Sequence, residues 1–202
     1  IDNTITAENF KYNKNSNILN AKNKVTIFDN LNDVVIKSND ITYNKNEESV
    51  FSKGLTTSLI EKKYHFKSQD IFYDKEKSIL SSNNKTYIND NKRNKYELDK
   101  FNYDILDQLL KGENIKIETV SADDKKDNYF FSEGFFKFKD QSFISKQTKI
   151  KIHKDVFNND KQDPRLYGSA SSGDDKKTEI KKGIFTSCSQ DQKCPAWSIT
   201  SK

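Results

Sequence analysis

The chain is poor in the residues that most chemical sites need. Its 202 residues include no methionine, one tryptophan, two prolines, two cysteines, two histidines and six glycines. No Gly-rich phosphate loop and no nucleophile elbow is present. The histidines, His65 and His153, lie on separate predicted strands away from both cysteines, so we expect surface positions rather than a zinc site or a general base. The sequence predicts no enzyme, no metal site and no cofactor.

Long hydrophobic runs are also missing. No run reaches the roughly 18 apolar residues that a membrane-spanning helix needs, so we expect no such helix. No secretory signal peptide is recognisable in the first residues. The chain starts within a predicted strand and stops abruptly after Ser198–Thr200. We interpret it as a piece of a longer protein.

A strong excess of one charge is absent too. The chain has 35 basic and 30 acidic residues, which gives a net charge of +5. Because the charges are interspersed, they indicate a solvated surface, with a weak attraction for phosphates or anionic lipid as the alternative. A nucleic-acid module is disfavoured because it would gather its basic residues into one stripe. Apolar residues make up only 33%, which is lean for a thick core but sufficient for thin sheets.

The chain does contain a short sequence motif that recurs at an almost constant spacing. The four copies are Ala7–Lys14, Ser38–Lys45, Ser68–Lys75 and Leu98–Ile105, and a degenerate fifth copy is Phe136–Asp140. The tyrosines of the four copies, Tyr12, Tyr43, Tyr73 and Tyr103, follow one another at steps of 31, 30 and 30 residues. A fixed period of this length marks an array in which each unit buries its apolar face against its neighbours.

Within each repeat, the residue pattern predicts two strands with a bend. Alternation with period two predicts strands at 24–27, 114–118 and 149–153, and short Asn/Asp-rich segments predict the turns. An apolar residue precedes the first apolar position of each copy by five residues, as Ile36 precedes Ile41. An odd offset would send the two side chains to opposite faces, so we infer a bulge or corner between them. The sequence therefore predicts an all-β structure of roughly ten to twelve strands in two facing sheets, with the four tyrosines in line.

The recurrent apolar residues are the candidates for the lining of the interior between these sheets. They are Phe10, Tyr12, Ile36, Ile41, Tyr43, Phe66, Ile71, Tyr73, Tyr96, Leu98, Phe101 and Tyr103. Two alternatives stay open from the residues alone. The lining surrounds an open, lipid-sized groove, or it fills a closed core, as in a structural or adhesive β-solenoid without a ligand.

The two cysteines, Cys188 and Cys194, are separated by a five-residue loop. A loop of this length can bring their Cα atoms within the roughly 4.4–6.8 Å that a disulfide requires. One interpretation is therefore a local disulfide or a buried structural pair. The other is pairing with cysteines elsewhere in a longer protein in an oxidising compartment.

The repeat and the tail both resemble a known family. The repeat Ser-x-Asp-Ile-x-Tyr, followed by a turn and Leu-x-Ser over Ser68–Ser81, resembles the OstA-like repeat of lipopolysaccharide-transport proteins. The tail segments Gly168–Ser172, Ile184–Cys188 and Pro195–Ile199 are similar to the region before the barrel in the LptD family of outer-membrane lipopolysaccharide-assembly proteins. The resemblance implies a twisted β-jellyroll of OstA-like repeats over residues 1–157, its last strands and loops over 158–183, and a linker over 184–202 leading to a C-terminal β-barrel.

The resemblance also implies a function. A domain of this family lies at the periplasmic face of the outer membrane and receives lipopolysaccharide from an OstA-like bridge protein. The bridge protein would dock at the N-terminal edge, around Thr4–Lys11. The twelve lining residues would contact the acyl chains, which pass on to the barrel of the same chain and its plug lipoprotein. In such a protein at least one of Cys188 and Cys194 would form a disulfide with the barrel.

Overall fold

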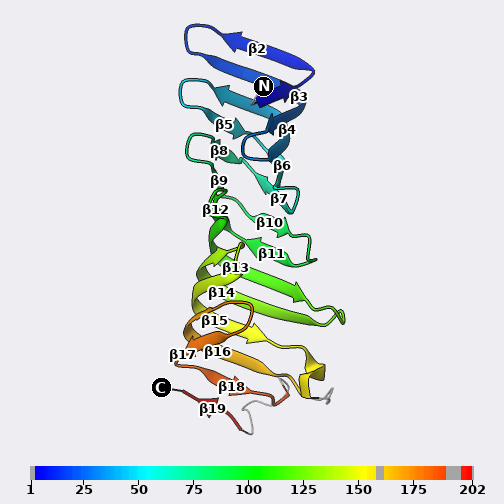
Figure 1. The fold of residues 1–202 in the computed structure, drawn as a ribbon, viewed down its shortest axis with the longest axis vertical. Helices are drawn as coiled ribbons and strands as arrows, with labels where there is room; N and C mark the ends of the chain where they lie inside the picture. The colour runs from blue at the N-terminus through cyan, green and yellow to red at the C-terminus, as the bar shows by residue number, and fades with distance from the viewer. Residues whose placement is uncertain (1–2, 158–161, 190–196, 202) are drawn as a thin grey trace.

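The computed structural model describes residues 3–157, 162–189 and 197–201, and nearly all of its regular structure is antiparallel strand. The strands stack along one long axis, from β2 at one end to β19 at the other (Figure 1). A single 3-10 turn, η1 (Lys154–Phe157), interrupts them. The strands are β1 (Asn3–Thr6), β2 (Asn9–Asn13), β3 (Ile18–Asp29), β4 (Val34–Asn44), β5 (Ser49–Ser52), β6 (Leu55–Ile60), β7 (Tyr64–Gln69), β8 (Phe72–Asp74), β9 (Ile79–Ser82), β10 (Thr86–Asn89), β11 (Lys95–Leu98), β12 (Lys100–Asp104), β13 (Leu109–Val120), β14 (Lys126–Lys137), β15 (Ser142–Lys151), β16 (Arg165–Gly173), β17 (Thr178–Lys181), β18 (Ile184–Thr186) and β19 (Ile199–Thr200).

The pairing separates these strands into two ladders that face each other. Ladder I runs through β2, β3, β4, β5, β8, β9, β12, β13, β14, β15, β16 and β17. Ladder II runs through β1, β3, β4, β6, β7, β10, β11, β13, β14, β15, β16, β18 and β19. Six long strands belong to both ladders, with one half in each. Elsewhere the two halves are separate short strands, one in each ladder. The predicted all-β jellyroll of bent hairpins is confirmed.

The bend between the ladders explains why the strand count differs from the prediction. The described residues form 19 strands rather than ten to twelve. The excess arises because arms such as β5–β6 and β7–β8 are broken at the corner, whereas β3 and β4 cross it unbroken. In β3 the pairing with β4 shifts register between Lys22 and Val25, so the bulge lies on the strand opposite Ser38–Asp40, where the corner of β4 is predicted. The corner residues with left-handed backbone are Asn23, Lys24, Gly54, Asp70, Asn114 and Gln147.

Buried hydroxyl groups satisfy one another along this corner. Thr56 Oγ1 lies 2.8 Å from Ser52 Oγ and 3.2 Å from Ser38 Oγ. The same arrangement recurs one repeat later, where Thr86 Oγ1 donates to Ser68 Oγ at 2.8 Å. Buried polar groups without partners are costly, so these short hydroxyl chains let small side chains occupy the inner side of the bend.

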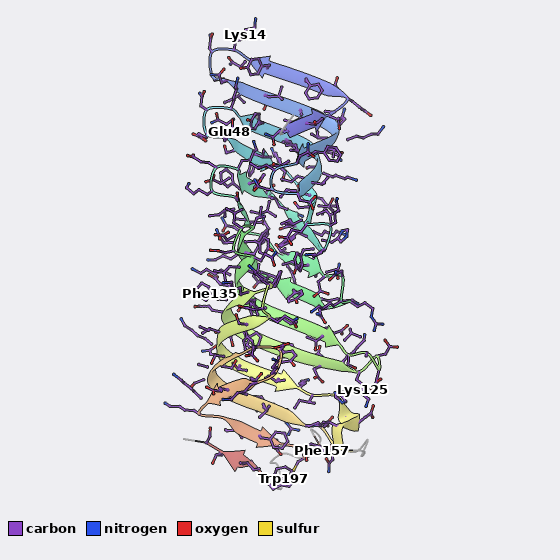
Figure 2. The ribbon with its side chains drawn as sticks, in the orientation of Figure 1. Lys14, Glu48, Lys125, Phe135, Phe157 and Trp197 are labelled. Carbon is purple, nitrogen blue, oxygen red and sulfur yellow. The ribbon has the colours of Figure 1, made fainter. Side chains whose placement is uncertain are left out.

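The turns of ladder I repeat one local design. The residue after each repeat tyrosine is Asn or Asp, and its side-chain oxygen accepts a hydrogen bond from a backbone N–H two or three residues later, at 3.0 Å in all four copies. The residue five positions after each tyrosine has left-handed backbone; these residues are Asn17, Glu48, Ser78 and Gln108. The period seen in the sequence is therefore the period of this turn. The turns of ladder I form one row along the array and the turns of ladder II form another; Glu48 belongs to the first row and Lys125 to the second (Figure 2).

Candidate functional site

The interior between the ladders is apolar along the whole array. On ladder I the tyrosines are in register, each separated from the next by one aliphatic residue: Tyr12, Leu19, Tyr43, Val50, Tyr73, Leu80, Tyr103 and Leu110. The predicted line of four tyrosines is confirmed. The facing row on ladder II is equally continuous: Ile5, Ile27, Ile36, Ser58, Phe66, Ile88, Tyr96, Ile117, Tyr129, Ile150, Leu166, Phe185 and Ile199.

In the N-terminal half this interior is filled by its own side chains. Eight of the candidate lining residues are buried there: Ile36, Ile41, Phe66, Ile71, Tyr73, Leu98, Phe101 and Tyr103. Tyr43 and Tyr96 are half-buried. Phe10 and Tyr12 have exposed fractions of 52% and 47%, because β2 is the last strand of its ladder at the N-terminal end. Whether any of the twelve contacts a lipid stays a prediction.

We call the line between the two rows of turns the seam. In the N-terminal half, side-chain hydrogen bonds close it. Tyr73 Oη on ladder I donates to Asp29 Oδ2 at 2.7 Å, and Asn32 Nδ2 donates to the same carboxylate at 3.1 Å. Ser78 Oγ donates to Asn32 Oδ1 at 3.2 Å, so the β3–β4 turn is tied to the β8–β9 turn.

A second closure lies one repeat further along the seam. Gln108 Nε2, in the β12–β13 turn, donates to Glu61 Oε1 at 2.6 Å. The carbonyl of Gln108 accepts the backbone N–H of Phe138 at 2.9 Å. The Phe138 ring, at the start of the β14–β15 turn, packs against Tyr64 with a centroid separation of 4.7 Å.

Beyond Phe138 the interior opens into a cavity of about 280 Å³. Its walls come from both ladders, and eight of the 19 lining residues are aromatic or aliphatic while the other eleven are polar or charged. The apolar lining residues are Tyr64, Tyr96, Ile117, Tyr129, Phe131, Phe136, Phe138 and Phe143. The volume is near the lower end of the range for small-molecule sites, and the cavity combines an aromatic wall with a polar rim.

Three phenylalanines form the floor of the cavity where β14 bends. Phe131 lies on the ladder II half of β14 and Phe136 on the ladder I half, with centroids 5.6 Å apart. Phe143 of β15 stacks on Phe136 at 5.9 Å with an interplanar angle of 12°. Offset and tilted ring contacts of this kind make a rigid apolar surface.

A row of small residues beside this floor distinguishes the C-terminal half. The row that holds Phe101 on β12 continues as Gly112, Gly134 and Ser145 in register. A Cβ at Gly134 would lie 2.6 Å from Cε2 of Phe136, so glycine allows the ring its position. In the earlier repeats this row alternates small and bulky residues, as in Ala21, Ile41 and Ser52. Gly134 stands where a bulky residue such as Ile41 or Phe101 would be expected, which explains in part why the interior is filled there and hollow here.

The rim of the cavity is polar and of mixed charge. It includes Asp90, Lys92, Lys137, Asp174 and Asp175. Asp90 accepts the backbone N–H groups of Lys92 and Asn94 at 2.9 Å each, so it fixes the β10–β11 turn. Backbone N–H groups of Lys176 and Lys177 hold the pKa of Asp174 below its usual value. The named rim residues are three aspartates and two lysines, so the rim carries both charges and forms no positive patch.

The aromatic wall of this site suits a flexible apolar ligand. Among residues 3–157, 162–189 and 197–201, no group of three or more His, Cys, Asp or Glu is placed to hold a metal ion. His65 is exposed on β7, and His153 is half-buried with its Nδ1 2.9 Å from Asp127 Oδ1. No helix in the described part of the chain is long and apolar enough to span a membrane.

Of the twelve candidate lining residues, Tyr96 lies in the wall of this cavity. The residues that the sequence reasoning missed belong mainly to β13, β14 and β15. A signal for them exists, since Tyr129, Phe130, Phe131, Phe135, Phe136, Phe138 and Phe143 crowd into a short stretch. The degenerate fifth repeat, Phe136–Asp140, falls within this stretch.

Cys194 lies outside the described residues, so both cysteine interpretations stay predictions. Cys188 is half-buried after β18. Its thiol lies 3.8 Å from the carbonyl oxygen of Trp197, which also accepts the Thr186 hydroxyl at 2.8 Å. β18 and β19 continue ladder II to the C-terminal end, where Phe157 and Trp197 are labelled in Figure 2.

The interior tyrosines predict a steep loss of stability at alkaline pH. Burial, a hydrogen bond to Glu48 and its charge raise the pKa of Tyr43 to about 12. Burial also raises the pKa of Tyr73, Tyr96 and Tyr103. An unfolded tyrosine ionises near pH 10. Above that pH the folded chain therefore holds more protons than the unfolded chain. The stabilisation that comes from the protonated tyrosines is fully present below about pH 10 and is lost as the pH rises towards 12.

We expect β-sheet circular dichroism and tyrosinate absorbance to change together in this range. Tyr43→Phe should move the midpoint to higher pH. Full ionisation of all nine tyrosines near pH 10 with the sheet signal intact would contradict their burial.

No protein-family model and no curated protein sequence matches the chain. Among solved structures, the chain is similar to the crystal structure of LptH, the LptA homologous periplasmic component of the conserved lipopolysaccharide transport device from Pseudomonas aeruginosa. The TM-score is 0.47 and the sequence identity is 17%, over 55% of this chain and 81% of that chain. A likeness at this level carries no argument about function, which has to rest on the geometry of this chain.

Proposed function

We propose that this chain is a lipid-conduit domain that binds the acyl chains of lipopolysaccharide between its two ladders. The observation that carries the proposal is the aromatic cavity of about 280 Å³ within a continuous apolar interior. Acyl chains need a non-directional apolar surface, and each buried methylene contributes about 0.8 kcal/mol. The phosphorylated sugars would stay in water at the polar rim, where Lys92 and Lys137 are the groups that attract them and three aspartates hold them away from the cavity. The OstA-like repeat over Ser68–Ser81 supports the same assignment.

The assignment extends to location and partners. We place the domain in the periplasm, at the inner side of the outer membrane, with lipid passing towards a C-terminal barrel and its plug lipoprotein. The support for this is the similarity of the tail segments to the LptD family. On this proposal the repeat jellyroll covers residues 1–157, its last strands and loops 158–183, and the segment leading to the barrel 184–202, which still adds β18 and β19 to ladder II.

The N-terminal edge is the proposed docking place of an OstA-like bridge protein. Within the described residues, β1 and β2 each pair with β3 alone, so each leaves one edge of backbone groups for another strand. Phe10 and Tyr12, half exposed on the inner row, would be covered by the next domain. We expect Tyr12→Asp to weaken bridge assembly, measured by co-purification. Tyr87→Asp, at a similar exposed fraction of 46% on the outer face, should not, and equal effects would place the dock elsewhere.

The alternative is a structural β-solenoid without a ligand. The filled N-terminal half favours it, because Tyr73 and Tyr103 there have no exposed surface. The two functions differ in what they predict for the cavity. A solenoid needs no hollow interior, and loss of the cavity would leave its function intact.

Photo-crosslinking at adjacent residues of β15 tests the proposal. Phe143 lines the cavity, whereas Ile144 is 66% exposed on the outer face. A photoreactive phenylalanine at Phe143 should capture lipopolysaccharide, and the same group at Ile144 should capture little. Equal capture at both positions would indicate adhesion to the surface. No capture at either would favour the solenoid.

A further inference from the structure

The boundary between the filled and the hollow halves of the interior is made mainly by one side chain. Phe138 lies in the cavity wall, and its ring centroid is 4.7 Å from Tyr64, 5.4 Å from Tyr96 and 5.7 Å from Tyr103. Tyr64 and Tyr96 also line the cavity, whereas Tyr103 does not reach it. Phe138 therefore stands between the cavity and Tyr103.

Behind Phe138 the packing is continuous. Tyr103 has no exposed surface, and its ring lies 5.3 Å from Phe66, which lies 5.2 Å from Phe101. The Tyr103 hydroxyl is buried and has no hydrogen-bond partner within the described part of the chain. A buried hydroxyl without a partner is costly, so Tyr103 is held in this place by the packing of its ring.

The backbone setting of Phe138 differs from that of its neighbours. Tyr64, Tyr96 and Tyr103 are on strands β7, β11 and β12. Phe138 follows the end of β14 and is held by one backbone hydrogen bond to Gln108, next to the Glu61–Gln108 closure of the seam. Its ring is half-buried.

We propose that Phe138 is the end wall of the acyl site, so that its size sets the longest chain that the cavity accommodates. This inference rests on the proposed function, since it concerns the same cavity. A chain entering from the open seam runs along Phe131, Phe136 and Phe143 and stops against Phe138. For lipid to continue into the N-terminal half, the Phe138 ring has to leave its place between Tyr64 and Tyr103.

Chain-length dependence of binding tests the proposal directly. The probes are saturated fatty acids of increasing length, used below their micelle concentrations and measured by calorimetry. For the unaltered protein, affinity should rise about fourfold per methylene and then level off where the chain meets the wall. Phe138→Ala should shift that plateau to chains longer by roughly two to four carbon atoms, because the cavity gains the volume of a ring.

Two further variants keep the test decisive if the alanine variant folds poorly. Phe138→Trp should shift the plateau to shorter chains. Phe135→Ala, on the outer face with 44% of its side chain exposed, should leave it unchanged. A plateau that stays in place in folded Phe138 variants would overturn the end-wall assignment while acyl binding itself stands. Failure of the unaltered protein to bind any chain would overturn the proposed function and this inference with it.

Discussion

Replacing Phe66 with alanine is expected to lower the free energy of unfolding by about 3–5 kcal/mol. Phe66 is 1% exposed on ladder II, and its ring contacts Phe101 and Tyr103 on ladder I at 5.2 and 5.3 Å. The substitution removes contacts that join the two ladders and leaves a void in a region that is otherwise filled. Urea denaturation measures the change, and the denaturant slope should stay constant.

His65→Ala is the matched control for Phe66→Ala. His65 is the preceding residue on β7 and points to the exposed outer face. We expect His65→Ala to change the free energy of unfolding by no more than about 0.5 kcal/mol. A loss of under about 1 kcal/mol for Phe66→Ala would mean that the N-terminal half relaxes around the void, and the contrast between a filled and a hollow half would fail.

Asp29→Ala is expected to lower the free energy of unfolding by about 2–4 kcal/mol, because it leaves several hydrogen-bond donors of the seam without an acceptor. Asp29 is 3% exposed and accepts hydrogen bonds from the Leu31 backbone, the Asn32 side chain and the Tyr73 hydroxyl, at 3.0, 3.1 and 2.7 Å. The Tyr73 hydroxyl would keep only the bond from Asn32 Nδ2 at 2.9 Å. The hydrogen bond from Ser78 to Asn32 would then be the main remaining tie across the seam in this region.

A double-mutant cycle separates this closure from a general loss of packing. Tyr73→Phe removes one hydroxyl and should cost about 1–2 kcal/mol. The Asp29→Ala and Tyr73→Phe changes should couple by about 1–2 kcal/mol, since each removes the partner of the other. Strict additivity in the unfolding free energies would show that the two side chains do not act together at the seam.

Much of the fold follows from short-range patterns in the sequence. The five-residue offset between Ile36 and Ile41 predicts the corner, because both side chains can face inward only if the backbone turns between them. The in-register tyrosines follow from the constant period, which comes from the turn after each tyrosine. The sequence does not show in the same way where a strand is interrupted at the corner, as between β7 and β8. These interruptions depend on backbone at residues such as Gly54 and Asp70, whose left-handed φ values of 80° and 51° residue type alone does not specify.

The site depends on contacts that the sequence pattern does not encode. The Asp29–Tyr73 and Asn32–Ser78 hydrogen bonds join residues 44 and 46 positions apart. No repeat unit carries them as a motif, so the closed seam could not be predicted. The hollow half arises where the repeat degenerates and Gly134 takes the place that a bulky residue such as Phe101 holds in the earlier repeats. The lining was therefore predicted from the regular repeats, whereas the structure places the cavity beside the irregular one.

The central claim is that the interior binds acyl chains rather than that the surface attracts an anion. Equilibrium binding of two matched ligands tests this most directly: intact lipopolysaccharide and the same molecule with its fatty acyl chains removed by hydrolysis, which keeps the phosphates and sugars. The account predicts saturable binding of the intact molecule and a loss of at least about a hundredfold for the deacylated one, since several buried methylenes are removed. Equal affinity for both ligands would contradict the account and assign the binding to surface lysines.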